Sequence, residues 1–409
     1  LLQLSGGSIY LGQQGITRGS AAANLPITIQ LQGGTLGADR SWSSSLDMQL
    51  GSAGGGVIIQ AQDSAGTARN ITLTGNLSDN GGVSASLTKT GSGLLSLGGA
   101  NTYTGGLIIQ NGTVEAKFTN AALGVGTVTM GGAGSPGATL ITGRSLDNPI
   151  IVNASDSGQI VIGANGIGSG FNLTAPVTLN GDLTLQTYDN VINGTIKAAA
   201  NLFGGLTGSG NLTLNNLGLA ANVINLKNAP INHSGSLTSQ GTATGDTKIS
   251  ADIGPNVTSV TQASATSSLV LSGNNDYTGN TTIIAGTLRL GAADVIPDGA
   301  GKGDLSVSGM FDLNGFSETI NGLIGGGVVD NTAVSTNVVL TLNANSIFAG
   351  TIQDSGAPLT LVKGPTGGVV LTGSNNNYRG GTIVQGGRLF ISNAGALTPN
   401  GSVQVNAGT

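Results

Sequence analysis

The chain of 409 residues contains no cysteine and one histidine, and aromatic residues make up only 3% of it. Without cysteine there are no disulfides, no thiolate-bound zinc and no cysteine nucleophile. With His233 as the sole histidine, no cluster of imidazoles is present to bind a transition metal. The shortage of large rings also argues against an ordinary globular core, because aromatic side chains normally dominate such cores.

Charge is scarce as well, since charged residues form 8% of the chain and the formal net charge is −5. The basic residues are scattered, so the sequence lacks the basic patch typical of nucleic-acid binding. It also lacks a Lys/Arg cluster that would attract an anionic membrane surface. No apolar run reaches the ~18 residues of a membrane-spanning helix. We therefore expect neither a nucleic-acid partner nor a helical membrane anchor.

Glycine and short aliphatic runs are what the chain has in abundance. Gly accounts for 72 residues, without the strict period of collagen, and 38% of the residues are hydrophobic, which is typical of a folded chain. Runs such as 183–185 and 339–342 alternate aliphatic residues with Thr or polar neighbours, as strands do. Strong helix formers are rare; only two glutamates occur. The sequence predicts an all-β fold of short strands separated by glycine-rich turns.

A longer pattern, Asn-x-Tyr-x-Gly, recurs three times, each followed by an aliphatic-rich segment and a second glycine nine residues after the tyrosine. A repeated spacing indicates a structural unit stacked on itself. The intervals between copies are unequal, which a solenoid accommodates more easily than an array of sandwich domains. The predicted structural motif residues are Asn101, Tyr103, Gly105 and Gly112; Asn275, Tyr277, Gly279 and Gly286; and Asn376, Tyr378, Gly380 and Gly387.

These segments resemble the autotransporter-associated β-strand repeat of bacterial type V secreted passenger domains. The resemblance is closest over 91–114, good over 269–290, and looser over 367–390, where Arg388 stands in place of the usual Thr. It implies a right-handed parallel β-helix exported across the outer membrane to the cell surface. It also implies a C-terminal outer-membrane barrel, which would lie outside this chain.

From the pattern and the resemblance together we expect a single right-handed parallel β-helix (a β-solenoid), with three strands per coil, running continuously over 1–409. Both ends stop within the strand pattern, so we expect a fragment or processed segment of a larger protein. The least patterned stretch, 228–264, contains Pro230, His233 and Pro255 and is the candidate for a loop excursion.

The tyrosines and asparagines of the motif are interpreted as structural. We expect each tyrosine ring to pack on the neighbouring coil while its hydroxyl reaches water. The asparagines are expected to bond local backbone at the corners, as Asn does in tight turns. No catalytic, cofactor-binding or metal-binding residue is assigned, and no cofactor is expected.

Other side chains have the types that metal binding or catalysis uses. The densest acidic group, Asp294, Asp298 and Asp304, has some of the oxygen ligands that calcium needs, but it occurs once and without a calcium-binding repeat. No Gly-x-Ser-x-Gly elbow accompanies His233, which we expect in a loop without chemistry. The lone Trp42 is interpreted as a packing residue.

The sequence thus favours a non-enzymatic extracellular or cell-surface structural β-solenoid: a stalk, an adhesin scaffold or a fibre-forming subunit. The alternative is a surface carbohydrate-active enzyme on the same scaffold, which would need two carboxylates facing each other across a groove. Expected partners are other copies of the chain, through head-to-tail or lateral contacts, and glycans or other cell surfaces.

Overall fold

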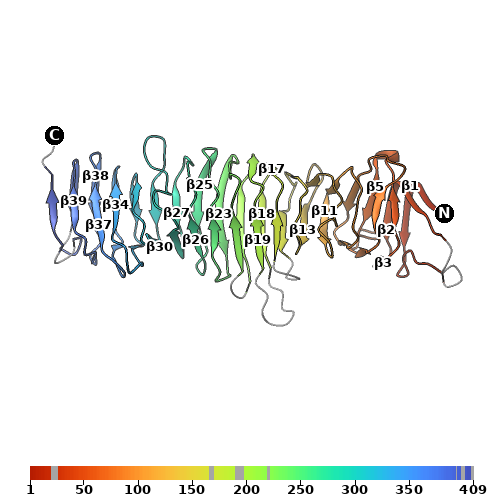
Figure 1. Cartoon of the computed structure of the whole chain (residues 1–409), viewed down its shortest axis with the longest axis horizontal. Coiled ribbons are helices and arrows are strands. Elements are labelled where there is room, and N and C mark those ends of the chain that lie inside the picture. The colour runs from red at the N-terminus through yellow and green to blue at the C-terminus, as the bar shows by residue number, and fades with distance from the viewer. Residues whose placement is uncertain are drawn as a thin grey trace. The chain divides into compact units, whose positions relative to one another are not determined.

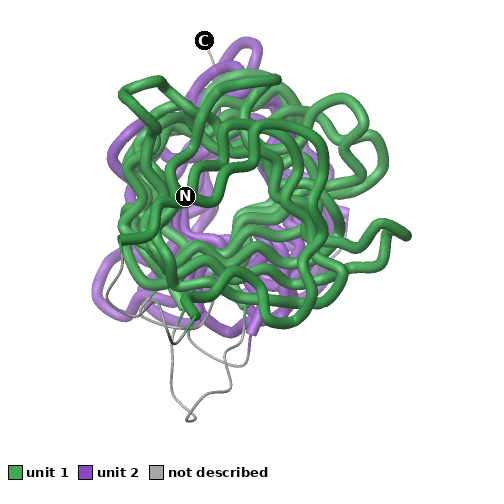
Figure 2. Tube along the Cα trace, turned by 90° about the vertical axis from the view of Figure 1, so that its right-hand side faces the viewer, with its two compact units in different colours: residues 1–210 green, residues 211–409 purple. Residues whose placement is uncertain are grey.

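The computed structural model describes residues 1–19, 26–164, 170–188, 198–218, 222–392, 394–397 and 401–406. The chain divides into two compact units, Leu1–Gly210 and Asn211–Thr409, which are green and purple in Figure 2. The prediction of one continuous helix over 1–409 stays a prediction.

Within each unit the strands stack side by side and pair in parallel, as Figure 1 shows. The described residues contain no α-helix; a short 3-10 turn, η2 (Ala53–Gly55), interrupts unit 1. The scarcity of helix formers and the alternation of aliphatic and polar residues account for this outcome. The predicted all-β parallel solenoid is confirmed.

Unit 1 contains one long sheet, a second sheet and a strand pair. In order of pairing the long sheet consists of β7 (Leu77–Asp79), β4 (Met48–Leu50), β2 (Ile29–Ala38), β5 (Val57–Gln60), β8 (Leu87–Thr90), β10 (Leu107–Ile109), β12 (Val128–Met130), β14 (Ile150–Asn153), β17 (Val177–Asn180) and β20 (Leu206–Gly208), with β1 (Leu2–Leu11) also on β2. The second sheet consists of β3 (Trp42–Ser44), β6 (Ile71–Leu73), β9 (Leu94–Leu97), β11 (Asn111–Ala116), β13 (Gly137–Thr142), β15 (Ile160–Ala164) and β18 (Leu183–Thr187), and the pair is β16 (Phe171–Leu173) with β19 (Ala199–Leu202).

Unit 2 has three stacks of strands. The first consists of β21 (Leu212–Asn216), β23 (Gly235–Gly241), β25 (Val257–Gln262), β27 (Thr281–Ile283), β29 (Leu305–Val307), β32 (Leu323–Gly325), β35 (Ser346–Phe348), β38 (Gly368–Leu371) and β40 (Arg388–Ile391). The second consists of β22 (Val223–Leu226), β24 (Thr247–Ile249), β26 (Ser268–Leu271), β28 (Thr287–Leu290), β30 (Met310–Asp312), β33 (Val328–Asp330) and β36 (Thr351–Ile352). The third consists of β31 (Glu318–Ile320), β34 (Val338–Leu342), β37 (Leu359–Lys363), β39 (Thr382–Val384) and β41 (Val403–Val405).

Three strands make one coil. In unit 2 the chain passes from β32 to β33 to β34, and the next coil repeats the circuit as β35, β36 and β37, each pairing in parallel with its counterpart. The coils that carry the Asn-x-Tyr-x-Gly motif differ, because the motif occupies one face as irregular backbone. It still continues the ladder there: Asn377 N donates to Ile352 O of β36 at 3.0 Å.

The core is a column of aliphatic side chains that stack in register from coil to coil. In unit 1 every member of one such column is at most 1% exposed. Burial of an aliphatic side chain of this size contributes about 1.5–3 kcal/mol relative to exposure, so the column accounts for much of the cohesion between coils. Its members are Leu87, Leu107, Val128, Ile150, Val177 and Leu206.

The segment 228–264 does not leave the coil as a loop, which corrects the expectation from its weak pattern. It contributes β23, β24 and β25, which pair in parallel with their neighbours. Its alternation is hard to recognise because polar side chains occupy inward positions that aliphatic residues fill elsewhere. Ser239, Thr247 and Gln262 are all 0% exposed.

Candidate functional site

The first motif asparagine, Asn101, joins three successive coils. Its Oδ1 accepts the backbone N–H of Leu77 in the preceding coil at 2.7 Å. Its Nδ2 donates to the carbonyl of Ala122 in the following coil at 2.5 Å. Asn101 is 1% exposed, so both bonds replace water for buried backbone groups. We call this arrangement the asparagine clamp.

The other two copies repeat the clamp at the same places. Asn275 accepts from Ile253 N at 3.0 Å and donates to Val295 O at 2.8 Å. Asn376 accepts from Ile352 N at 2.7 Å and donates to Ala396 O at 2.8 Å. The expectation of a bond to local backbone was therefore wrong. An Asn side chain has an acceptor and a donor at one end, so it can serve two coils at once.

The motif tyrosines lie inside the coils, with exposures of 0–1% for Tyr103, Tyr277 and Tyr378. The expectation that their hydroxyls reach water was wrong. Two hydroxyls instead meet a threonine four residues later: Tyr277 with Thr281 at 2.5 Å and Tyr378 with Thr382 at 2.7 Å. Leucine replaces this threonine in the first copy, and the Tyr103 hydroxyl has no hydrogen-bond partner among the described residues. Burial raises the pKa of all three tyrosines, so they stay neutral.

The motif glycines are needed for two reasons. The one nine residues after each tyrosine has positive φ, as at Gly112 (73°) and Gly286 (62°), a conformation that L side chains rarely adopt. The one two residues after each tyrosine lies against the coil beneath. A Cβ on Gly279 would come within 1.7 Å of Thr258 O.

A further element that the sequence reading missed is a polar side chain that fills the corner before each motif. Lys89 Nζ donates to three backbone carbonyls, of Thr90 (3.0 Å), Gly91 (2.6 Å) and Asn111 (2.9 Å), and the residue is 0% exposed. We call this arrangement the corner donor. Burial lowers the pKa of Lys89 to about 7.

The other motifs have corner donors as well. Gln262 Nε2 donates to Ser264 O (3.1 Å) and Ser267 O (2.7 Å). Lys363 Nζ donates to Gly364 O and Thr366 O, both at 2.5 Å. The signal in the sequence was a lone polar residue ahead of a short Gly- or Ser-rich turn, 12 or 13 positions before the motif asparagine.

Glu318 extends the second clamp into the next coil. Its carboxylate accepts Val295 N at 3.0 Å and Ile296 N at 3.3 Å, and the residue is 1% exposed. Burial, above all, raises the pKa of Glu318 to about 8, and the nearby Asp294 and Asp298 act in the same direction.

A pH dependence follows from Glu318. Its pKa rises from an ordinary 4.5 to about 8 on folding, so between these values the folded state holds a proton that the unfolded state has released. We expect the contribution of Glu318 to the free energy of unfolding to be greatest below pH 4.5. It should fall as the pH rises towards 8. Urea unfolding at pH 5 and pH 8 would measure the difference, and Glu318→Gln should abolish the fall. Lys89, whose pKa is lowered to about 7, acts in the opposite direction above pH 7. An unchanged difference in that variant would contradict the assignment.

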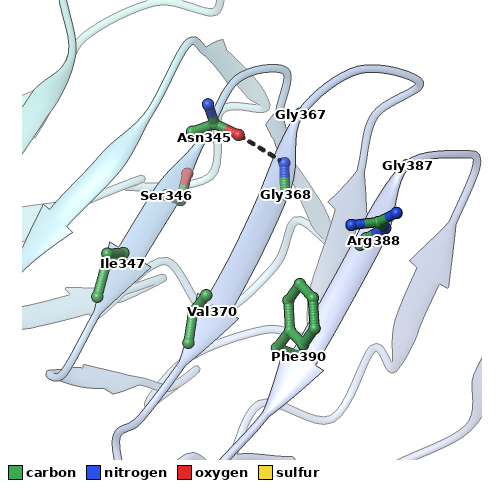
Figure 3. Close-up of a pocket in the computed structure, with 9 residues that line it drawn as sticks. All are labelled: Asn345, Ser346, Ile347, Gly367, Gly368, Val370, Gly387, Arg388 and Phe390. Carbon is green, nitrogen blue, oxygen red and sulfur yellow. Dashed lines mark hydrogen bonds between the residues drawn. The ribbon is translucent and has the colours of Figure 1, made fainter.

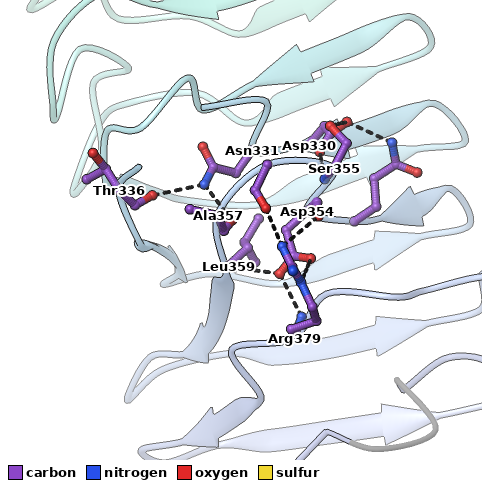
Figure 4. A network of polar contacts seen from close by, with 10 residues as sticks. Asp330, Asn331, Thr336, Asp354, Ser355, Ala357, Leu359 and Arg379 are labelled. Atoms are coloured by element: carbon purple, nitrogen blue, oxygen red, sulfur yellow. Dashed lines mark hydrogen bonds and ion pairs between the residues drawn. The ribbon is translucent and has the colours of Figure 1, made fainter. Parts of the chain in front are cut away.

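Figure 4 shows a denser polar network in unit 2, around a buried aspartate pair. Asp330 accepts from the backbone and hydroxyl of Ser355 at 2.8 and 2.9 Å. Asp354 accepts from the backbone N and Nε of Arg379, at 2.7 and 2.8 Å. Asn331 accepts from Gly315 N (2.9 Å) and donates to Ala357 O (2.7 Å), so it is a clamp without a neighbouring tyrosine. These carboxylates are occupied by bonds between coils.

The candidates for chemistry are not gathered into one site. Within the described ranges no group of three or more His, Cys, Asp or Glu residues is placed to hold a metal ion. Asp304 accepts Gly322 N at 2.9 Å. His233 lies outside the strands, as expected, but it is buried, and its Nε2 lies 3.2 Å from Ser236 O. Trp42 is packed as expected, with its indole N–H donating to Gly37 O at 3.2 Å.

The outer surface of unit 2 carries a shallow depression of about 530 Å³ over β35, β38 and β40. Figure 3 shows Ile347, Val370 and Phe390 along it, with Arg388 and Asn345 to one side. The lining is mainly apolar, with the polar residues Asn345 and Ser346, the cation of Arg388 and no carboxylate. It therefore lacks the carboxylate pair that glycoside hydrolysis requires.

In physical terms the chain is a parallel β-solenoid whose buried polar side chains bond one coil to the next. Among the residues described, none forms a helix that could span a bilayer. The passenger-associated-transport-repeat family matches at 87–116, 266–290 and 361–389, the segments that carry the three motif asparagines and tyrosines.

The chain is also similar to the adhesin BmaC autotransporter of Brucella suis, with 29% identity over 426 residues. That match covers 94% of this chain but only 12% of the Brucella protein. No solved structure matches the chain. Together the repeats and the relative support an autotransporter passenger repeat protein that is exported to the cell surface.

Proposed function

We propose that the chain is a non-enzymatic structural segment of an autotransporter passenger, serving as a stalk or scaffold for adhesion at the cell surface. The observation that carries this proposal is the asparagine clamp, present in all three motif copies. Several polar side chains that could do chemistry, among them Glu318, Asp330 and Asp354, are instead buried and bonded to backbone of neighbouring coils. The relative named as an adhesin supports a role in attachment.

Surface display tests the proposal. The chain would be fused to the membrane anchor of an autotransporter in a laboratory bacterium. On intact cells we expect antibody labelling of the chain, cleavage only by high protease concentrations, and no release of sugars from acidic or neutral polysaccharides. A matched strain displaying an unrelated β-solenoid of similar length is the control for attachment to host cells. A chain that is displayed but never raises attachment, alone or within its full reading frame, would rule out the adhesive part.

The rival function is a carbohydrate-active enzyme on the same scaffold. It would be established if sugar release were found and one Asp substitution abolished it without loss of folding. The aspartates bonded between coils, such as Asp330 and Asp354, argue against this, because each is already bonded to neighbouring backbone or side chains.

A further inference from the structure

One outer face of unit 2 presents a straight row of side chains, one from each of five adjacent strands. The strand register places these residues directly beside one another along β29, β32, β35, β38 and β40. Ile347 is 63% exposed and Phe390 is 51% exposed. We call this set the outer row; its members are Ser306, Ile324, Ile347, Val370 and Phe390.

On one side of the outer row lies a parallel rank, two residues earlier in each strand. It begins with Asp304 and ends with Arg388, and Gly322, Asn345 and Gly368 lie between them. One oxygen of Asp304 accepts Gly322 N, and Asn345 Oδ1 accepts Gly368 N at 2.8 Å. Arg388 takes part in none of the ion pairs found among the described residues. The rank therefore carries a negative charge at one end and a positive charge at the other.

The other side of the outer row is flat. The residues two positions after its members have small side chains or none, so nothing there prevents another surface from approaching the apolar row. They are Ser308, Gly326, Ala349, Thr372 and Ser392.

We propose that the outer row is the interface of an antiparallel dimer with a second copy of this chain. A twofold axis along β35, between the two faces, would set Ile347 against Ile347 of the second copy. The same rotation sets Val370 of one copy against Ile324 of the other. Because the axis is parallel to the strands, each residue keeps its position along the strand direction. Asp304 and Arg388 lie two strands to either side of β35, so each would face the opposite charge of the other copy.

This self-complementarity identifies the occupant. A twofold contact uses the same patch on both subunits, so every residue must meet a suitable partner from its own row. The charges satisfy that condition because they differ in sign and are equally distant from the centre, at about 4.8 Å per strand. In addition, the depression beside Val370 leaves room for Ile324 of the second copy, since Gly367, Gly368 and Gly387 lack side chains there. The proposal does not rest on the passenger function.

Sedimentation velocity of the full chain over a range of concentrations tests the dimer. We expect a monomer–dimer equilibrium whose dissociation constant rises at least ten-fold with Ile347→Asp. The matched control is Val334→Asp, at a position that is 86% exposed but lies in the loop after β33, away from the outer row. Circular dichroism confirms that both variants fold. A chain that stays monomeric up to millimolar concentration overturns the proposal, and so does the finding that the outer row binds a different ligand and no second copy.

Cysteine cross-linking tests the orientation, and the native chain offers no competing thiol. Under mild oxidation Ile347→Cys should form a disulfide-linked dimer, whereas Val334→Cys should not. An equal mixture of Asp304→Cys and Arg388→Cys chains should cross-link, while neither variant alone should do so. Cross-linking of Asp304→Cys with itself would indicate a parallel contact and overturn the antiparallel arrangement.

Discussion

Replacing Asn101 with alanine is expected to destabilise the surrounding coils by about 3 kcal/mol, since each buried backbone group left without a partner costs about 1–3 kcal/mol. The two groups are Leu77 N and Ala122 O, which lie in the preceding and following coils. Alanine offers neither an acceptor nor a donor, and at 1% exposure the site of Asn101 is closed to bulk water. The loss should therefore appear on both sides of the mutated coil.

Hydrogen exchange can localise this effect, because a solenoid opens coil by coil rather than as one unit. Faster exchange is expected at Leu77 and in the coil of Ala122, with little change far along the unit. The matched control is Asn76→Ala: Asn76 is exposed and accepts a single bond, from Ala100 N at 2.8 Å. If Asn101→Ala and Asn76→Ala lowered the free energy of unfolding equally, the asparagine clamp would contribute no more than an exposed asparagine does.

Lys89→Met is expected to cost about 3 kcal/mol, because three carbonyls lose a donor while the volume of the side chain is nearly kept. The carbonyls of Thr90, Gly91 and Asn111 converge on Nζ at the corner between strands β8 and β9. A methionine thioether has no proton to offer them. Part of this loss is offset, because the substitution also removes the free-energy cost of burying a charged ammonium group.

Lys89→Gln is the informative companion of Lys89→Met. The chain itself places Gln262 at the corresponding corner of the second motif, where one amide serves two carbonyls. We therefore expect Lys89→Gln to recover more than half of the stability that Lys89→Met loses. Urea denaturation of the three proteins provides the comparison. Equal stability of the Gln and Met variants would show that filling volume, not donation, is the role of Lys89.

The fold could be predicted because its determinants are local and repeated. Alternating runs such as 183–185 specify strands, and the repeated glycines mark turns. The glycine nine residues after each motif tyrosine, such as Gly112, has positive φ. The motif positions could also be predicted from their spacing alone. Where the alternation is carried by inward Ser239, Thr247 and Gln262 instead of aliphatic residues, the strand signal disappears although the strands remain.

The partners of the motif residues could not be predicted in the same way. Asn101 bonds to residues 24 positions before it and 21 after it, and only the coil register brings them together. The hydroxyl of Tyr277 has its hydrogen-bond partner in Thr281, a residue whose type and place in the sequence are those of an ordinary strand position. Lys89 and Glu318 have the residue types of surface positions, and only the structure shows that they are enclosed.

The span of the clamp limits where the chain can be divided. A fragment that stops between Asn101 and Ala122 retains the bond to Leu77 but loses the one beyond, so its last coil ends on an unpaired amide. During synthesis or export from either end, a coil that carries a clamp asparagine forms both of its clamp hydrogen bonds only after the next coil has folded onto it. Subcloning should accordingly place boundaries outside 77–122 and outside the corresponding intervals of the other two motifs.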